Sequence, residues 1–158
     1  DTQFLVGHLA AWNYYQSVKS KNNKEFVKSF KKYCKNNGLP GGSKRVTDDP
    51  IEAAYIGVYL WSTACEKAGS FEVDKVRPEL YGLKFDAPGT SVMLDPKNHH
   101  LHKPVLIGET KKNGQFKVVH SSKGLVAPEP WSVYTSPCKS CDHVKFSGTY
   151  DIPDCSKS

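Results

Sequence analysis

The sequence predicts the α/β fold class, and three observations carry this prediction. Two long stretches, residues 20–37 and 49–68, repeat apolar residues at three- and four-residue spacings, which is typical of amphipathic helices. Residues 70–82 show the same spacing over a shorter span. Residues 103–122 read as two apolar strands joined by an Asn-Gly turn, which indicates a β-hairpin.

Length and composition favour a globular chain that forms one domain, or one lobe with an appendage. The chain has 158 residues, of which 38% are hydrophobic and 24% charged. No apolar run approaches the roughly 18 residues that span a membrane. The net charge is +6, and lysines concentrate in residues 19–35. Lysines opposite an apolar stripe usually form a solvated helix face, and no nucleic-acid-binding motif is present, so we expect no nucleic-acid partner.

The first stretch, residues 4–15, reads as a strand that leaves its sheet and enters a crossing. Its end places three aromatic residues, Trp12, Tyr14 and Tyr15, within four positions. Such a cluster can stack on a planar ligand or close a hinge, and it can also be ordinary packing. We therefore take these three residues as candidates for ligand binding or for a hinge.

The helix expected over residues 20–37 has Asn22 or Asn23 available as its cap. Residues 36–43, rich in Asn, Gly and Pro, end this helix with dense turn signals. Its apolar stripe consists of Phe26, Val27, Phe30, Tyr33 and Cys34.

The helix expected over residues 49–68 has the clearest boundaries. Asp48 and Asp49 can cap its first turn, Pro50 suits the first helical position, and Gly69 can end it. Tyr59, Ala64 and Ala68 widen the apolar face, so we expect burial on more than one side. That face consists of Ile51, Ala54, Tyr55, Val58, Trp61, Ser62 and Cys65.

A brief helix and two short strands follow. Pro78 is tolerated only in a first turn, so the helix within residues 70–82 should be short. Residues 83–85 and 91–94 read as strands, and residues 95–102 as a loop. The strand within residues 4–15 has no sequence neighbour to pair with. These strands do not close a convincing sheet, so we expect the rest of the fold to lie elsewhere.

Histidines and cysteines were considered as chemical sites. His99, His100 and His102 share one loop, and imidazoles are common zinc ligands, but such close histidines seldom converge on one ion. Cys138 and Cys141 form a single C-x-x-C, which favours disulfide partners over a redox pair or half a metal site. We expect no metal and no cofactor.

The last 21 residues hold three of the five cysteines, Cys138, Cys141 and Cys155, as disulfide candidates. Disulfides imply an oxidising compartment. The chain begins at Asp1 without an initiator methionine, so we expect either a removed leader or a piece of a longer chain. No nucleophile, phosphate-binding or dinucleotide motif is present, so an enzyme is not expected. A zinc-dependent or thiol enzyme remains an alternative.

Several stretches in order resemble the C-terminal part of the substrate-binding proteins of urea and short-chain amide ABC transporters. The resemblance covers about residues 4 to 131. The matching stretches are GHLAAWNYYQSV (7–18), NKEFVKSFK (23–31), RVTDDPIEAAYIGVYLW (45–61), EKAGS (66–70), FDAP (85–88), LDPKNHH (94–100), NGQF (113–116) and PEP (128–130).

The resemblance implies a type I periplasmic-binding fold, in which two lobes close on a small ligand across three chain crossings. Residues 4–9 would be the last strand of one lobe, with Trp12 to Tyr15 at the hinge. Residues from about 22 to 102 would belong to the other lobe, and the hairpin would return to the first. This divides the chain into a binding-domain part, residues 1–131, and a Cys/Ser/Pro-rich tail, residues 132–158.

The resemblance also implies a non-enzymatic binder of urea or a short-chain amide, periplasmic or extracellular, that serves a membrane permease. Most ligand contacts would lie in an N-terminal half, supplied in cis or by a second chain. The turn 34–43 and the tail are longer than in this family, and the tail is richer in cysteine. These departures favour the alternative, an extracellular receptor or structural ectodomain.

Overall fold

The computed structural model describes residues 2–129, and its mixed helices and strands confirm the α/β class. The helices in this range are α1 (Lys21–Asn36), α2 (Asp49–Ala68) and α3 (Val73–Leu80). The strands are β1 (Leu9–Trp12), β2 (Lys84–Asp86), β3 (Ser91–Leu94), β4 (Leu101–His102), β5 (Leu106–Thr110) and β6 (Phe116–Ser121). Short 3-10 helices cover Thr2–Leu5 and Gly42–Lys44. The expected boundary after residue 131 and the tail 132–158 lie outside the described residues.

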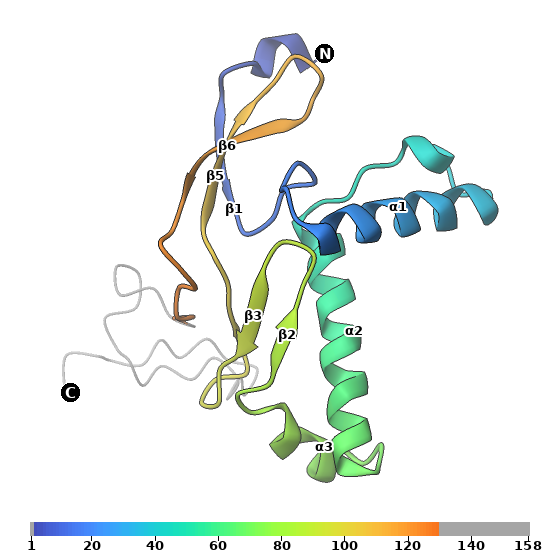
Figure 1. Ribbon diagram of the computed structural model, residues 1–158, viewed down its shortest axis with the longest axis vertical. Coiled ribbons are helices and arrows are strands. Elements are labelled where there is room, and N and C mark those ends of the chain that lie inside the picture. Colours follow the sequence, from blue (N-terminus) through green and yellow to red (C-terminus); the bar gives the residue numbers. More distant parts are fainter. Residues whose placement is uncertain (1, 130–158) are drawn as a thin grey trace, which may run out of the picture. The chain divides into compact units, whose positions relative to one another are not determined.

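The strands form two three-stranded antiparallel sheets, in the orders β1-β5-β6 and β2-β3-β4 (Figure 1). As expected, the first strand has no partner next to it in sequence, and its partner is a distant strand. β1 pairs with β5, with Leu9 opposite Glu109 and Trp12 opposite Leu106. The two strands are far apart in sequence, so reading neighbouring stretches could not find the pairing.

The first strand begins later than expected. Residues 4–9 were expected to be strand, but the segment starts as a 3-10 helix and β1 begins only at Leu9. Gly7, with φ of 86°, turns the chain between them, and its N–H donates to the Thr110 carbonyl at 3.0 Å. A left-handed residue at this point cannot continue an extended strand, and glycine adopts it without penalty.

α1 matches the expected span, but its cap is Ser20 and not Asn22 or Asn23. The Ser20 hydroxyl accepts from the Asn23 N–H at 2.9 Å and donates to the Pro88 carbonyl at 2.6 Å. Asn22 instead donates to the Asp86 carbonyl at 3.2 Å. Ser20 therefore both starts α1 and ties it to the segment after β2.

α2 has the expected bounds and caps. Asp48 accepts from the Ile51 N–H at 3.0 Å, and Gly69 ends the helix at φ of 58°. The expected apolar face is wrong in part, because Val58 and Trp61 are exposed, although Ala64 and Cys65 are buried as expected. The buried residues of α2 are Glu52, Ile56, Leu60, Ala64 and Cys65. Since all sides of this helix are apolar, periodicity could not tell which side faces the rest of the chain.

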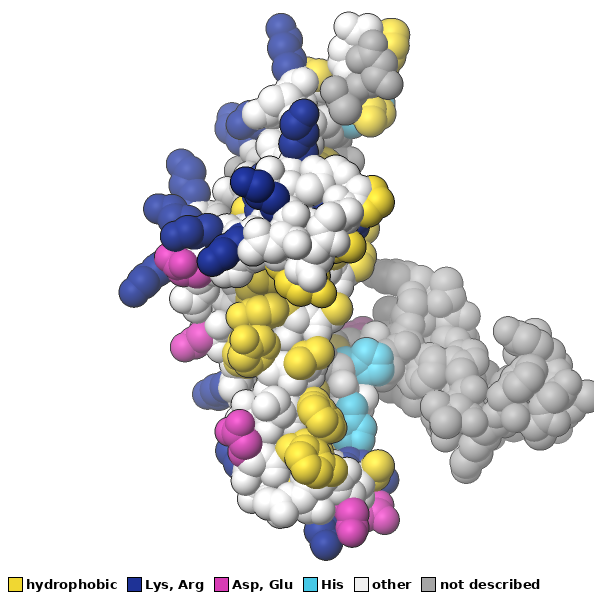
Figure 2. All heavy atoms as spheres, turned by 90° about the vertical axis from the view of Figure 1, so that its right-hand side faces the viewer, with side chains coloured by type: hydrophobic (Ala, Val, Ile, Leu, Met, Phe, Trp, Pro, Cys, Tyr) yellow, Lys and Arg dark blue, Asp and Glu magenta, His cyan; other side chains and the backbone are white. Residues whose placement is uncertain are grey.

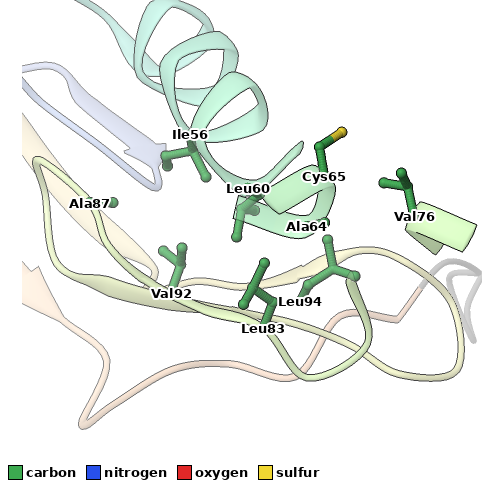
Figure 3. Packing of buried hydrophobic residues seen from close by; sticks show 9 residues of the cluster. All are labelled: Ile56, Leu60, Ala64, Cys65, Val76, Leu83, Ala87, Val92 and Leu94. Carbon is green, nitrogen blue, oxygen red and sulfur yellow. The ribbon is translucent and has the colours of Figure 1, made fainter. Parts of the chain in front are cut away.

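The core lies between α2 and the β2-β3-β4 sheet, with α3 closing one end (Figure 3). Each fully buried aliphatic side chain contributes about 1.5–3 kcal/mol. The buried residues of this core are Ile56, Leu60, Ala64, Cys65, Val76, Leu83, Ala87, Val92 and Leu94. Cys34 and Cys65 are buried free thiols.

The remaining elements follow the sequence with two corrections. Pro78 lies in the second turn of α3, not the first, although the helix is brief as expected. The loop expected over residues 95–102 ends in a strand, β4. The hairpin β5–β6 is confirmed, and Gly114 takes φ of 73° in its turn. No helix of residues 2–129 has the length and apolarity needed to cross a membrane.

Candidate functional site

Two segments connect the β1-β5-β6 sheet to the part of the chain built on α1, α2 and α3 (Figure 1). Residues 13–20 run from β1 to α1, and residues 103–105 run from β4 to β5. The Asn13 side-chain amide donates to the Pro104 carbonyl at 2.6 Å. The two crossings are thus joined side by side, although they are 91 positions apart in sequence.

Tyr14 anchors the first crossing to the helical part. Its ring is 1% exposed, and its hydroxyl donates to Asn23 Oδ1 at 2.7 Å and lies 2.8 Å from Thr47 Oγ1. Phe26 packs edge-on against the ring, with centroids 6.3 Å apart. Burial raises the pKa of Tyr14 to about 12, so the phenol stays neutral and keeps its proton for Asn23.

Asn23 completes this anchor from the first turn of α1. Its Nδ2 donates to the carbonyls of Gln16 at 2.9 Å and Val18 at 2.7 Å, while its Oδ1 accepts from Tyr14. Asn23 is buried, and all its polar capacity points at the crossing. An amide in this position fixes the crossing's path because each of its bonds is made away from water.

Tyr15 packs on the opposite side, against the β1-β5-β6 sheet. Its hydroxyl donates to the Ala10 carbonyl at 2.6 Å, and its ring lies 4.7 Å from that of Phe116. A Cβ placed on Gly108 of β5 would lie 2.7 Å from Tyr15 Cζ. The Tyr15 ring therefore needs a glycine at this position of β5. Of the two successive tyrosines, Tyr14 contacts the helical part and Tyr15 contacts the β1-β5-β6 sheet.

Gln16 connects the two sides through its own amide. Its Oε1 accepts from the Thr47 N–H, before α2, at 2.9 Å. Its Nε2 donates to Gln115 Oε1, beside the turn of the β5–β6 hairpin, at 3.3 Å. One side chain thus holds a residue from each part of the chain.

A buried ion-pair network fixes the second crossing. Lys103 Nζ lies 3.1 Å from Glu52 Oε2 and 3.3 Å from Asp49 Oδ1. Glu52 Oε1 also accepts from the Gly89 N–H at 2.8 Å. Glu52 is only 1% exposed, and both of its carboxylate oxygens have a partner inside the protein. The crossing is thereby bound to the start of α2.

A cavity of about 250 Å³ lies beside the first crossing. Trp12 presents a half-exposed ring there, next to the amides of Gln16 and Gln115 and the carboxylate of Asp49. The cavity is lined by Trp12, Tyr14, Tyr15, Gln16, Ser17, Val46, Thr47, Asp48, Asp49, Gly114, Gln115 and Phe116. Its walls combine aromatic faces with hydrogen-bonding groups, as small-solute sites do.

The structure brings the expected site residues Trp12, Tyr14 and Tyr15 to this one cavity. Their environments differ: Tyr14 and Tyr15 are buried with their hydroxyls bonded internally, and only Trp12 exposes much of its ring. Trp12 is therefore the one of the three whose ring is accessible from the cavity. The two tyrosines hold the crossing in shape.

Several residues of the site were not found from the sequence. Glu52 is the only charged residue between Asp49 and Glu66 of an apolar helix, and this isolation was a signal of a buried, paired charge. Gly108 inside a strand was a signal of close approach. The roles of Asn13 and Gln16 depend on distant partners and had no local signal.

The loop histidines do not converge. His102 Nε2 lies 2.9 Å from Asp95 Oδ2, and the His99 ring stacks on Tyr81 at 4.9 Å. The Lys97 N–H, with help from His102 and the Asn98 N–H, holds the pKa of the Asp95 carboxyl below its usual range. Within residues 2–129, no group of three or more His, Cys, Asp or Glu side chains is placed to hold a metal ion. Cys138, Cys141 and Cys155 lie outside the described residues.

A family model described as a periplasmic binding protein domain matches residues 1–137. The match covers most of the chain, so the chain belongs to the periplasmic binding protein domain family. The fold and the paired crossings agree with this membership.

Solved structures of this class share the fold. One is a solute-binding protein of an ABC transporter from Rhodopseudomonas palustris BisB5 in complex with 3,4-dihydroxybenzoic acid, with 23% identity and a TM-score of 0.63. The match covers 78% of this chain and 33% of the Rhodopseudomonas palustris chain. Another is an amino acid ABC transporter substrate-binding protein from Pseudomonas fluorescens Pf-5, with 19% identity and a TM-score of 0.65. That match covers 82% of this chain and 34% of the Pseudomonas fluorescens chain.

A curated protein named limonene hydroxylase, from Geobacillus stearothermophilus, is 27% identical over 129 residues. The match takes in 82% of this chain but 22% of that protein. The chain therefore spans about a third of the solved relatives and about a fifth of the curated one.

Proposed function

We propose that this chain is part of a solute-binding protein of the ABC-transporter class, which binds a small solute between two lobes and carries out no chemistry on it. The observation that carries the proposal is the pair of joined crossings, Asn13 to Pro104, between a sheet and a helical part. Binders of this kind close by hinge motion of such segments. Family membership supports the same reading.

The ligand we propose is urea or a short-chain amide, on the resemblance of the sequence stretches and on the chemistry of the cavity. A planar amide can stack on the half-exposed Trp12 ring while its N–H and C=O groups meet the Asp49 carboxylate and the Gln16 or Gln115 amide. A volume of about 250 Å³ suits a solute of this size better than a large one.

The proposed partners follow from the same class. The rest of the binding domain, in cis or as a second chain, would supply most ligand contacts, and a membrane permease would receive the solute. The proposed location is periplasmic or extracellular. A receptor or structural ectodomain that reuses this fold is the second candidate, because the tail carries three cysteines.

Calorimetric titration of the complete protein containing this chain tests the proposal. The panel is urea, formamide and acetamide, with 4-hydroxybenzoate and leucine as solutes of other chemistry. We expect one of the amides to bind saturably and to raise the unfolding midpoint. At a solute concentration of one hundred times the Kd, the free energy of unfolding should rise by about 2.7 kcal/mol.

Replacing the aromatic wall gives the matched comparison. Trp12→Ala should weaken amide binding at least tenfold, while Tyr33→Ala, which removes a more exposed aromatic on α1, should leave it unchanged. Saturable binding of the aromatic acid or of leucine, with no amide binding, would overturn the ligand. No binding of any solute would favour the receptor or structural reading.

A further inference from the structure

The side of α2 that faces away from the core is apolar, and within residues 2–129 its side chains are exposed. Val58 is 64% exposed and Trp61 is 50% exposed, while Phe71, just after the helix, is 80% exposed and stacks on Trp61 at 6.0 Å. Figure 2 shows hydrophobic side chains running in a band along this face of the molecule. We call the surface made by Ala53, Ala54, Gly57, Val58, Trp61 and Phe71 the α2 outer face.

Charge is absent from this part of the helix. Residues 53 to 65 contain no charged side chain on any side, whereas the exposed side of α1 carries several lysines. An exposed helix face normally carries charged residues, and a continuous apolar one marks a surface that another element covers. The α2 outer face therefore has the chemistry of an interior layer.

Gly57 supplies a second, independent observation. A Cβ at this position would meet nothing within 4 Å, so no contact in the described part of the chain requires a glycine. Glycine within a helix is unfavourable relative to alanine. Ala53, Ala54 and Gly57 are all small and exposed, so another backbone can approach α2 closely beside Val58 and Trp61.

The family relation identifies the occupant. The solved relatives are about three times as long as the part that this chain covers, so most of the domain is not represented in residues 2–129. Within residues 2–129, the fully buried side chains of α2 lie on the side of the β2-β3-β4 sheet and α3, and the α2 outer face has no such cover. A second layer of the same domain fits the other face.

We propose that the α2 outer face is the surface on which the remaining part of the same binding domain packs, through an apolar layer whose backbone approaches Gly57. This inference rests on the proposed function for the existence of that remaining part. It assigns the outer face a fixed structural contact, remote from the cavity at the crossings, that does not depend on ligand.

Hydroxyl-radical footprinting of the complete protein, read by mass spectrometry, tests the proposal. Oxidation rates of individual side chains are normalised to those of the unfolded protein. We expect Trp61 and Phe71 to be protected as strongly as buried Tyr14, while exposed Tyr33 on α1 is oxidised freely. Free oxidation of Trp61 and Phe71 in the complete protein would overturn the proposal.

The 158-residue chain by itself, at several concentrations, distinguishes the occupants. We expect Trp61 and Phe71 to be oxidised there at every concentration. Protection that grows with concentration would mean that a second copy covers the face, which would also overturn the proposal.

A substitution pair gives a second readout. Val58→Lys should lower the unfolding midpoint of the complete protein, and Tyr33→Lys should not. Both measurements are made without solute, so they stand even if the titration finds no binding. Protection of Trp61 together with failed binding would leave the interface intact and remove only the proposed ligand.

Discussion

Tyr14 and Tyr15 are neighbours in sequence but hold opposite sides of the crossing. Tyr14 reaches Asn23 and Thr47 on the helical side, and Tyr15 lies across Gly108 on the sheet side. Consecutive side chains in an extended segment point in opposite directions, which allows one dipeptide to do both. The position of the crossing is thus set by two phenols.

Removal of the Tyr14 hydroxyl tests its part of this anchor. Tyr14→Phe removes the donor to the buried Asn23 Oδ1 and one of the two partners of the Thr47 hydroxyl, so the free energy of unfolding should fall by about 1–3 kcal/mol. Urea unfolding measures the change. Tyr33→Phe, at an exposed position, should have no effect. Equal stability of Tyr14→Phe and the parent chain would show that the hydrogen bonds do not anchor the crossing.

At this scale the sequence located residues better than it assigned roles. Asp48 caps α2 as expected, and the three aromatics predicted for the hinge or the ligand all line one cavity, while their role stays a prediction. The division of labour among Trp12, Tyr14 and Tyr15 could not be predicted. It depends on partners as far along the chain as Gly108 and Phe116, which only the folded chain brings into contact.

The bounds of α2, Asp49–Ala68, agree with the prediction, yet the prediction of its buried side is wrong in part. Helix boundaries depend on local signals such as a capping carboxylate and a left-handed glycine, and these are present in the sequence. The buried side depends on which other elements pack there. A helix apolar all round offers no local signal for that choice.

Two glycines inside regular elements should respond oppositely to the same substitution. Gly57→Ala in α2 should raise the stability of this chain by about 0.5–1 kcal/mol, because the added methyl meets open space and alanine is the better helix former. Gly108→Ala in β5 should lower stability by about 1–3 kcal/mol, because its methyl would overlap the Tyr15 ring.

Urea unfolding of both variants beside the parent chain checks the pair. A destabilising Gly57→Ala would mean that the outer face is already covered within this chain. A neutral Gly108→Ala would mean that the Tyr15 ring moves freely and does not fix the sheet side of the crossing.

At the scale of the whole molecule, the β1-β5-β6 sheet joins strands that are far apart in sequence, so local sequence patterns could not predict it. β1 pairs with β5, and Asn13 bonds to Pro104, across nearly the length of the described chain. Only the family resemblance pointed to paired crossings. The match to a periplasmic binding protein domain over residues 1–137 confirms that part of the resemblance, while the urea or amide ligand stays a proposal.

The central claim is that the joined crossings are the hinge of a solute binder. Pulsed electron spin resonance tests this claim in the complete protein by measuring the distance between two spin labels. The labels are placed at two exposed lysine positions, Lys117 on β6 and Lys28 on α1. We predict a shorter and narrower distance distribution when solute is saturating, because the sheet side and the helical side close about residues 13–20 and 103–105. A distribution that stays the same while solute is bound would contradict the account.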